Sequence, residues 1–334
     1  MAHQRFIWAD ALKGWLIMLV VLGHAIQNTL GEACESNHLW NIIYSFHMAA
    51  FMAVSGYVAF RPDTKWGGQF VCQTIWRRFR QLVVPFILWS IISQLVGERI
   101  DVEKLGLYIL YPDKSLWFLW VLFFINMIFL LGSYLAEIIK ASQELLLLII
   151  CLFLTVVMVR FEVRVFGYQF ISYYFLFYTL GYFFHKYKKC VTSSSIFLQV
   201  ILCVCWAFLA WFWQMHELPI FMKGLPLPTT IMQYAYRFIT AAIAVYLLLV
   251  LSPKIINSTR KWNQPLVNLG KISLGIYAVH FIILGVWISF FNEMGLNEDC
   301  VIVCTFAMTL TVTWIIVWLL SIWHVTATWL LGKI

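Results

Sequence analysis

Residues 6–27 read FIWADALKGWLIMLVVLGHAIQ, an apolar run of about the length that crosses a lipid bilayer as a helix. Three ionisable side chains interrupt it: Asp10, Lys13 and His24. At about 100° per residue, Lys13 and His24 return to within about 20° of the same helix face, and Asp10 lies about 40° away. Because an ionisable group inside a bilayer is costly unless it is paired or faces a watery cavity, this stripe is a candidate functional site.

The stripe has two interpretations. In the functional one, a cationic entry at Lys13 leads to the His24 imidazole about 16 Å further across the membrane. In the structural one, Asp10 and Lys13 pair near the interface with the ammonium reaching toward water, and His24 hydrogen-bonds within the helix bundle. The sequence leaves both open.

Similar apolar runs recur along the whole chain, with no polar block long enough for a separate soluble module. Of the 334 residues 63% are hydrophobic and 11% charged, which excludes an ordinary soluble domain. We expect a single transmembrane domain over residues 1–334, an all-α polytopic bundle of about ten transmembrane helices. The expected spans are 6–27, 39–60, 82–97, 116–136, 145–159, 170–184, 196–215, 229–251, 269–291 and 301–331.

The formal net charge of +8 is a topology signal, because the basic residues stand in short gaps between apolar runs rather than on a water-facing domain. With the N-terminus inside, fifteen lysines and arginines fall in inner segments and six in outer loops. This bias predicts that both termini are cytoplasmic. We expect membrane lipids around the protein, no nucleic-acid partner, and no metal, since the cysteines and histidines lack zinc-ligand spacing.

Other polar residues fall in the predicted second, eighth and ninth spans. His47 and Ser55 belong to the second, and Arg237 stands near the middle of the eighth, where its charge must face the bundle interior. Tyr277 and His280 share one face of the ninth. The histidines are therefore expected to line one cavity; for Ser55, close helix packing is the competing interpretation.

A basic cluster, Arg77-Arg78-Phe79-Arg80, precedes the third span. Arg77 and Arg80 are three residues apart and can grip phosphate oxygens from one helix face, which suits a nucleotide or coenzyme anion. Anchoring on anionic lipid headgroups is the alternative. Trp117, at the start of the fourth span, is typical of an interfacial aromatic belt, with a substrate-stacking surface as the second interpretation.

Together these motifs resemble the acyltransferase-3 family of integral membrane O-acyltransferases, in particular its sugar O-acetylase branch typified by fucose 4-O-acetylase. Many family members carry arginine where this chain has Lys13, so the charge is kept but the bidentate fork is lost. The matching elements follow the family's order over most of the chain: Arg5, Asp10, Lys13-Gly14, Val20 and His24; Ser45-Phe46-His47-Met48; Ser55-Gly56-Tyr57; Arg77-x-x-Arg80 with Pro85; Trp117-Phe118-Leu119; and Gly270-x-x-Ser273 through Tyr277 to His280.

The resemblance implies an O-acetyltransferase of the bacterial cytoplasmic (inner) membrane, with no tightly bound cofactor. Its donor substrate is acyl-CoA, usually acetyl-CoA, and its acceptor is a hydroxyl of a sugar, glycan or lipid-linked saccharide. His24 is then the essential histidine, with Asp10 and Lys13 in support, and Arg77 and Arg80 bind the coenzyme. The expected lining of the substrate cavity is His47, Ser55, Trp117, Arg237, Tyr277 and His280.

Two alternatives remain open at this level. A glycolipid transporter or flippase would use the polar stripe as a permeation path, although no pair of related halves with interrupted helices is visible in the sequence. An acyltransferase that uses succinyl or longer acyl groups is the other, because aromatic-rich helices suit a small or a large pocket.

Overall fold

The computed structural model describes residues 6–96, 101–188, 195–256 and 263–333, so Arg5 of the N-terminal motif lies outside the described residues. Within these ranges the chain forms helices and turns and no strand. It divides into two compact units, which are described separately. The first unit comprises Met1–Ala59 and Gly181–Trp314, and the second comprises Phe60–Leu180 and Ile315–Ile334.

Eight helical segments of the described chain are long and apolar enough to cross a membrane, which confirms an all-α polytopic membrane protein. They are Ile7–Ser36, His38–Ala59, Gly68–Val96, Trp117–Ile138, Gln143–Phe161, Thr229–Ile255, Ser273–Glu293 and Glu298–Leu320. The two remaining predicted spans correspond to α9 (Tyr168–Lys186) and the shorter α11 (Ile196–Trp211). Ten crossings and cytoplasmic termini stay predictions.

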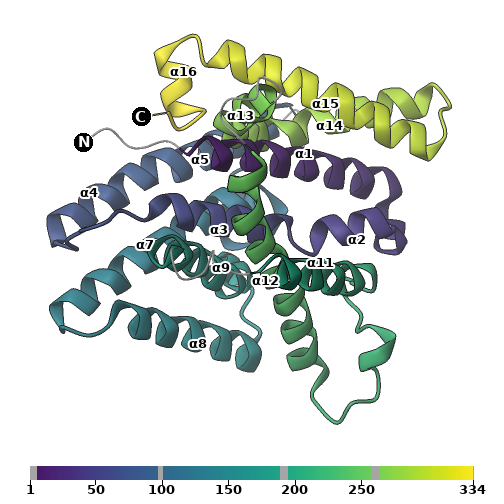
Figure 1. The fold of residues 1–334 in the computed structure, drawn as a ribbon. Coiled ribbons are helices and arrows are strands. Elements are labelled where there is room, and N and C mark those ends of the chain that lie inside the picture. The colour runs from purple at the N-terminus through teal and green to yellow at the C-terminus, as the bar shows by residue number, and fades with distance from the viewer. Residues whose placement is uncertain (1–5, 97–100, 189–194, 257–262, 334) are drawn as a thin grey trace. The chain divides into compact units, whose positions relative to one another are not determined.

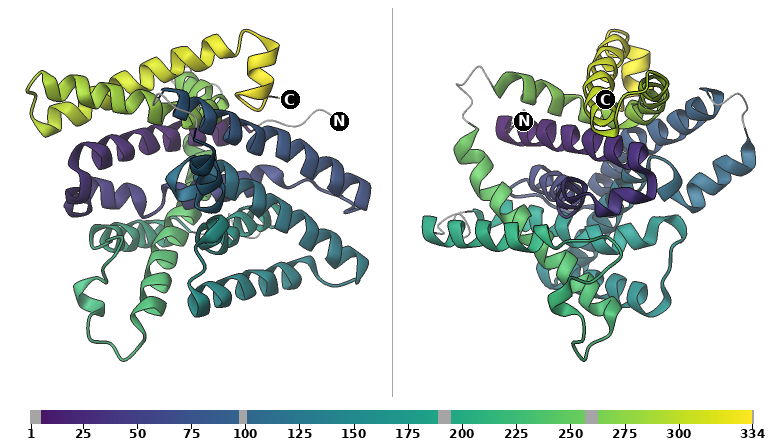
Figure 2. Two further views of the ribbon diagram at one scale, coloured as in Figure 1. Left: turned by 180° about the vertical axis from the view of Figure 1, so that it is seen from behind. Right: turned by 90° about the vertical axis from the view of Figure 1, so that its right-hand side faces the viewer.

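The first unit is organised around α1 (Ile7–Leu30), an unbroken helix in which residues such as Leu16, Val21 and Ala25 are fully buried. In Figures 1 and 2, one side of α1 faces α13 and α14 and the other faces α2 and α3. These neighbours of α1 are α13 (Gln264–Lys271), α14 (Ser273–Glu293), α2 (His38–Tyr44), α3 (His47–Ala59) and α12 (Thr229–Ile255).

Two glycines let α1 and α13 touch backbone to backbone. A Cβ built on Gly270 would lie 2.6 Å from the carbonyl carbon of Asp10 and 3.0 Å from the amide nitrogen of Gly14. A Cβ on Gly14 would in turn lie 3.0 Å from the amide nitrogen of Gly270. No side chain fits at this crossing, as is usual where helices approach closely in membranes.

The predicted second span, 39–60, corresponds to the candidate span His38–Ala59 and differs only in that it is not one continuous helix. It consists of α2 and α3, separated by a turn at Ser45 and Phe46. The Ser45 hydroxyl donates to the carbonyl oxygen of Ile42 at 2.7 Å, a bond that competes with regular helix geometry. Both α2 and α3 pack against α1.

The second unit is built on α7 (Trp117–Ile138), which packs against α4, α8 and the turn between α4 and α5. Helix α8 exposes large apolar side chains of the kind that face lipid: Leu152 and Phe153 are 56% and 65% exposed. The other elements of this unit are α4 (Gly68–Arg78), a π-helical turn (Phe79–Val83), α5 (Val84–Val96), α6 (Val102–Leu110), α8 (Gln143–Phe161), most of α9, and α16 (His324–Trp329).

Three other predicted spans, the third, ninth and tenth, also differ from the structure. The candidate span that contains the basic cluster starts at Gly68, so Arg77 and Arg80 lie within Gly68–Val96 and not before its beginning. Its 29 residues exceed the roughly 20 that a bilayer core requires, which leaves room for a polar end. The ninth span is interrupted at Ile272, between α13 and α14.

The tenth span is also broken. Helix α15 (Glu298–Leu320) ends and a turn leads to α16, whereas residues 301–331 were expected to form one helix. The Thr326 hydroxyl donates to the carbonyl oxygen of Leu320 at 2.6 Å, which satisfies one of the acceptors left free at the end of α15.

Candidate functional site

His24 lies half-buried on α1, beside the end of α2. The Tyr44 hydroxyl donates to Oε1 of Gln27 at 2.6 Å, and its oxygen is 3.4 Å from Nδ1 of His24. Because the Tyr44 hydroxyl donates its proton to the hydrogen bond with Gln27, the Tyr44 oxygen can only accept a hydrogen bond from Nδ1–H of His24. In that tautomer Nε2 of His24 carries a lone pair and can accept a proton.

Local packing holds Tyr44 against His24. A Cβ on Gly23 would lie 2.9 Å from the Tyr44 ring, so the ring occupies the space that a side chain at this position would fill. On its other side, the Tyr44 ring stacks on Trp40 with centroids 4.0 Å apart. Because Gly23 has no side chain, the Tyr44 ring can pack beside it and contact His24.

A second imidazole adjoins the first. The rings of His24 and His280 have centroids 5.2 Å apart, and Phe281 packs against His24 at 4.4 Å. His280 is fully buried, and its Nδ1 lies 2.7 Å from the carbonyl oxygen of Tyr277 and 3.2 Å from that of Ile276. Nδ1 is thus the proton-bearing nitrogen, which leaves Nε2 as an acceptor with no hydrogen-bond partner among the described residues.

His47 is the third imidazole of the cluster. It is buried at the start of α3, and its Nδ1 donates to the carbonyl oxygen of Ile43 at 2.6 Å. Its ring lies 4.9 Å from the ring of Tyr44. Tyr44 therefore contacts both His24 and His47, and the site draws its side chains from α1, α2, α3 and α14.

Asp10, Lys13 and Ser55, which the sequence also predicted for this site, have other surroundings than the histidine cluster. Asp10 and Lys13 are half-buried on α1, one turn apart and beside the glycine crossing. The Ser55 hydroxyl donates a hydrogen bond to the carbonyl oxygen of Phe51 in the same helix, at 2.8 Å. This bond favours the packing interpretation of Ser55.

Arg237 is half-buried on α12, with its guanidinium carbon 5.6 Å from the centre of the Trp213 ring. A cation over an indole face is an attractive interaction. Tyr277 is buried on α14, and its carbonyl oxygen fixes the orientation of His280.

The basic cluster belongs to the second unit. Arg77 is exposed at the end of α4, Arg80 is half-buried in the π-helical turn, and Arg78 donates to Oε1 of Gln81 at 3.1 Å. The π-helical turn is notable because such turns are frequent at functional sites. Arg77 and Arg80 remain candidates for binding an anion.

Trp117 also belongs to the second unit. Its ring stacks on Phe170 and Tyr174, with centroids 4.5 and 5.6 Å apart. The stack occupies part of the indole face that a substrate would need.

Sequence reasoning missed Tyr44 and Gln27. A signal was present for Gln27, which follows His24 by three residues on the same helix, whereas a turn separates Tyr44 from His47, so helix spacing does not connect those two. No group of three or more His, Cys, Asp or Glu residues in the described ranges is arranged to hold a metal ion.

A family model described as an acyltransferase domain, the acyltransferase-3 model, matches residues 6–318. The chain is also 37% identical over 91 residues to nodulation protein NolL of Sinorhizobium fredii, covering 26% of this chain and 24% of that protein. It is 28% identical over 130 residues to nodulation protein NolL of Mesorhizobium japonicum, covering 36% of this chain and 34% of the relative. No solved structure matches. Since the family model spans almost the whole chain and includes the histidine cluster, the protein belongs to the acyltransferase-3 family.

Proposed function

We propose that this protein is a membrane O-acyltransferase that moves an acetyl group from acetyl-CoA to a hydroxyl of a sugar, glycan or lipid-linked saccharide. The observation that carries the proposal is the adjacent pair His24 and His280, in which the Nδ1 of His280 is committed to backbone carbonyls and its Nε2 has no described partner. Membership of the acyltransferase-3 family supports it. The family match does not identify the donor or the acceptor.

The proposed reaction needs a base. The acceptor oxygen attacks the thioester carbonyl carbon, a C–O bond forms, and the hydroxyl proton passes to an imidazole nitrogen. The C–S bond then breaks, and the sulfur leaves as a thiolate that receives this proton, so the base is regenerated. We assign the base to His24, because it is half-buried and open to a substrate, whereas His280 is fully buried.

His280 and Tyr44 are positioning residues in this scheme. The Tyr44 oxygen faces Nδ1 of His24 and favours the tautomer with a free Nε2. His280 lies against His24 and fixes one side of the imidazole. Asp10 lies on the same helix more than three turns away, so we assign it, with Lys13, an electrostatic role rather than direct contact with the ring.

The donor end of the scheme rests on the guanidinium groups. Arg77 and Arg80 supply fixed positive charge of the type that binds phosphate oxygens, and we assign them to the coenzyme phosphates. Acetyl-CoA is a cytosolic substrate in this scheme, consistent with the predicted cytoplasmic position of the basic segments. We place the protein in the bacterial cytoplasmic membrane, as its resemblance to the sugar O-acetylases of the family implies.

The test is transfer of radiolabelled acetyl from acetyl-CoA to glycan or glycolipid in membranes that contain the protein. His24→Ala is expected to lower transfer by at least about 100-fold, the usual contribution of a positioned base. His324→Ala, an exposed histidine at the start of α16, is the matched control and should keep full transfer. Full activity in His24→Ala would refute the assignment. Movement of an acceptor across vesicles without acetyl-CoA consumption would support a transporter instead.

A further inference from the structure

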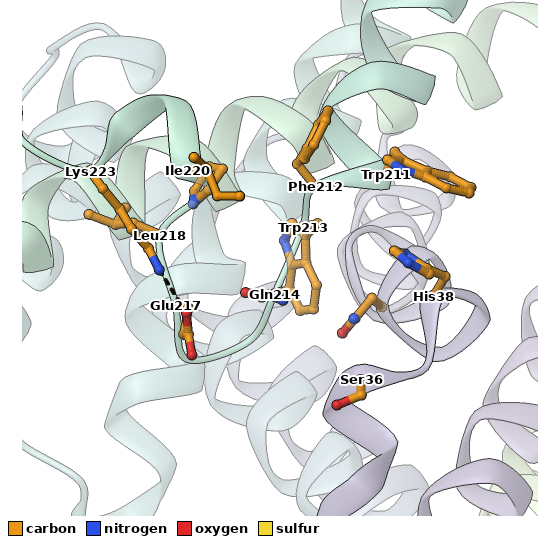
Figure 3. Close-up of a pocket in the computed structure, with 12 residues that line it drawn as sticks. Ser36, His38, Trp211, Phe212, Trp213, Gln214, Glu217, Leu218, Ile220 and Lys223 are labelled. Atoms are coloured by element: carbon orange, nitrogen blue, oxygen red, sulfur yellow. Dashed lines mark hydrogen bonds and ion pairs between the residues drawn. The ribbon is translucent and has the colours of Figure 1, made fainter.

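A cavity that the acyl-transfer scheme does not use lies in the first unit, beside the start of α2 and the segment that joins α11 to α12 (Figure 3). Its volume is about 350 Å³, which accommodates a small molecule. One wall is aromatic: His38 and Trp211 stack with ring centroids 4.6 Å apart and planes 13° from parallel. Trp211 is 55% exposed, so part of its indole is open to a ligand.

The polar part of the lining is suited to a neutral ligand. Lys223 is paired with Glu217, with 3.0 Å between Nζ and Oε2, as Figure 3 shows. Asn41 and Trp213 line the same cavity and are buried, and the Oδ1 of Asn41 and the Nε1 of Trp213 have no hydrogen-bond partner in the part of the chain that the structure describes. An acceptor and a donor are thus left beside an aromatic platform.

This combination fits a sugar better than a coenzyme. A pyranose ring presents an apolar face to an aromatic side chain and hydroxyl groups that both donate and accept hydrogen bonds. A coenzyme phosphate would need cationic groups, and the one lysine among the lining residues is already neutralised by Glu217.

The cavity and the histidine cluster share one short helix. His38 and Asn41 line the cavity from α2, and Tyr44, which contacts His24, is the last residue of the same helix. Asn41 and Tyr44 are three residues apart, a rise of about 4.5 Å along the axis. The ring of Trp40 also stacks on that of Tyr44. Helix α2 therefore connects the cavity to the residue that contacts the proposed base.

We propose that this cavity binds the saccharide part of the acceptor, with Trp211 and His38 as the stacking platform and Asn41, Trp213 and Glu217 as polar partners. The inference rests on the proposed acyl transfer and adds to it the place where the sugar is recognised. Glu217 is exposed, and its carboxylate has lone pairs to accept hydrogen bonds from sugar hydroxyls while it pairs with Lys223.

Direct binding tests the inference without any catalysis. The purified protein is titrated with methyl α-L-fucoside and methyl β-D-glucoside, and saturation transfer from protein to glycoside is measured by NMR. Trp211→Ala is expected to weaken binding about tenfold, and Glu217→Gln, which keeps the side-chain shape, about threefold. Trp318→Ala is the matched control, because Trp318 on α15 is also 55% exposed. Equal binding by Trp211→Ala and wild type, or no binding of either glycoside to wild type, would overturn the inference.

The transfer assay separates this inference from the proposed function. Trp211→Ala and Glu217→Gln should raise the acceptor KM by the same factors while the acetyl-CoA KM stays constant. If wild type binds a glycoside but moves no acetyl group to it or to membrane glycans, the proposed function fails and the sugar site stands. If transfer proceeds and neither variant changes the acceptor KM, the sugar site fails and the function stands.

Discussion

Replacing Gly270 by alanine tests the backbone contact that joins α1 to α13. The added Cβ would lie 2.6 Å from the carbonyl carbon of Asp10, while ordinary contact begins at 3.4 Å, so the two backbones must separate by at least about 0.8 Å. Both partners are backbone, so no flexible side chain can absorb the shift. Overpacking of this kind costs about 1–3 kcal/mol. We expect a fall in apparent Tm of about 2–6 °C.

The same shift reaches the candidate site. Ile272 alone separates α13 from α14, which carries His280, and α1 carries His24. A displacement near 1 Å between positioned groups lowers transfer by up to about 100-fold. We expect Gly270→Ala to lose more activity than its loss of folded protein explains.

The assay combines thermal unfolding in detergent with acetyl transfer at matched amounts of folded protein. Gly285→Ala is the control, since Gly285 lies in α14 and a Cβ there meets nothing within 4 Å. Alanine at such a helix position should leave stability unchanged or raise it by up to about 1 kcal/mol. If Gly270→Ala behaved like Gly285→Ala in both Tm and transfer, the close contact between α1 and α13 would be disproved.

Three further predictions concern the site. Tyr44→Phe keeps the ring but removes the oxygen that faces His24, and should lower kcat about fivefold with little change in Tm; an unchanged kcat would remove Tyr44 from the positioning role. Gly23→Ala places a methyl group against the packed Tyr44 ring and must shift it from His24, so transfer should fall and stability should drop by about 1–3 kcal/mol; unchanged transfer would contradict this. Arg80→Ala should raise the acetyl-CoA KM about tenfold relative to Arg160→Ala, an exposed arginine on α8, and unchanged donor kinetics would favour lipid anchoring.

The sequence predicted the helical elements well, because the length of an apolar run is a direct signal of a spanning segment. Two of its errors are helix breaks at which a hydroxyl group bonds to a backbone carbonyl; the interruption at Ile272 and the start of the third span at Gly68 are separate differences. The Ser45 hydroxyl bonds to Ile42 at one break and the Thr326 hydroxyl to Leu320 at the other, and a hydropathy average does not register such bonds.

The residue types of the candidate site and the gathering of its histidines were expected from the sequence, but the individual contacts were not. Spacing along one helix predicted Tyr277 and His280 on a common face, but the contact of His280 with His24 is a contact between distant segments of the chain. Tyr44 was missed because its role depends on the turn after α2 and on the absence of a side chain at Gly23, which leaves room for the tyrosine ring. The sugar cavity was missed for a similar reason, since His38 and Trp211 have no pattern that connects them in the sequence.

The π-helical turn at Phe79–Val83 makes the segment from Gly68 to Val96 sensitive to register rather than to length. Such a turn holds one residue more than an α-helical turn, and one residue corresponds to about 100° of rotation. A single deletion within it would therefore act as a twist, turning the apolar face of α5 relative to the arginines of α4. Chains that differ by one residue here can have helices of nearly equal length and present their guanidinium groups in different directions.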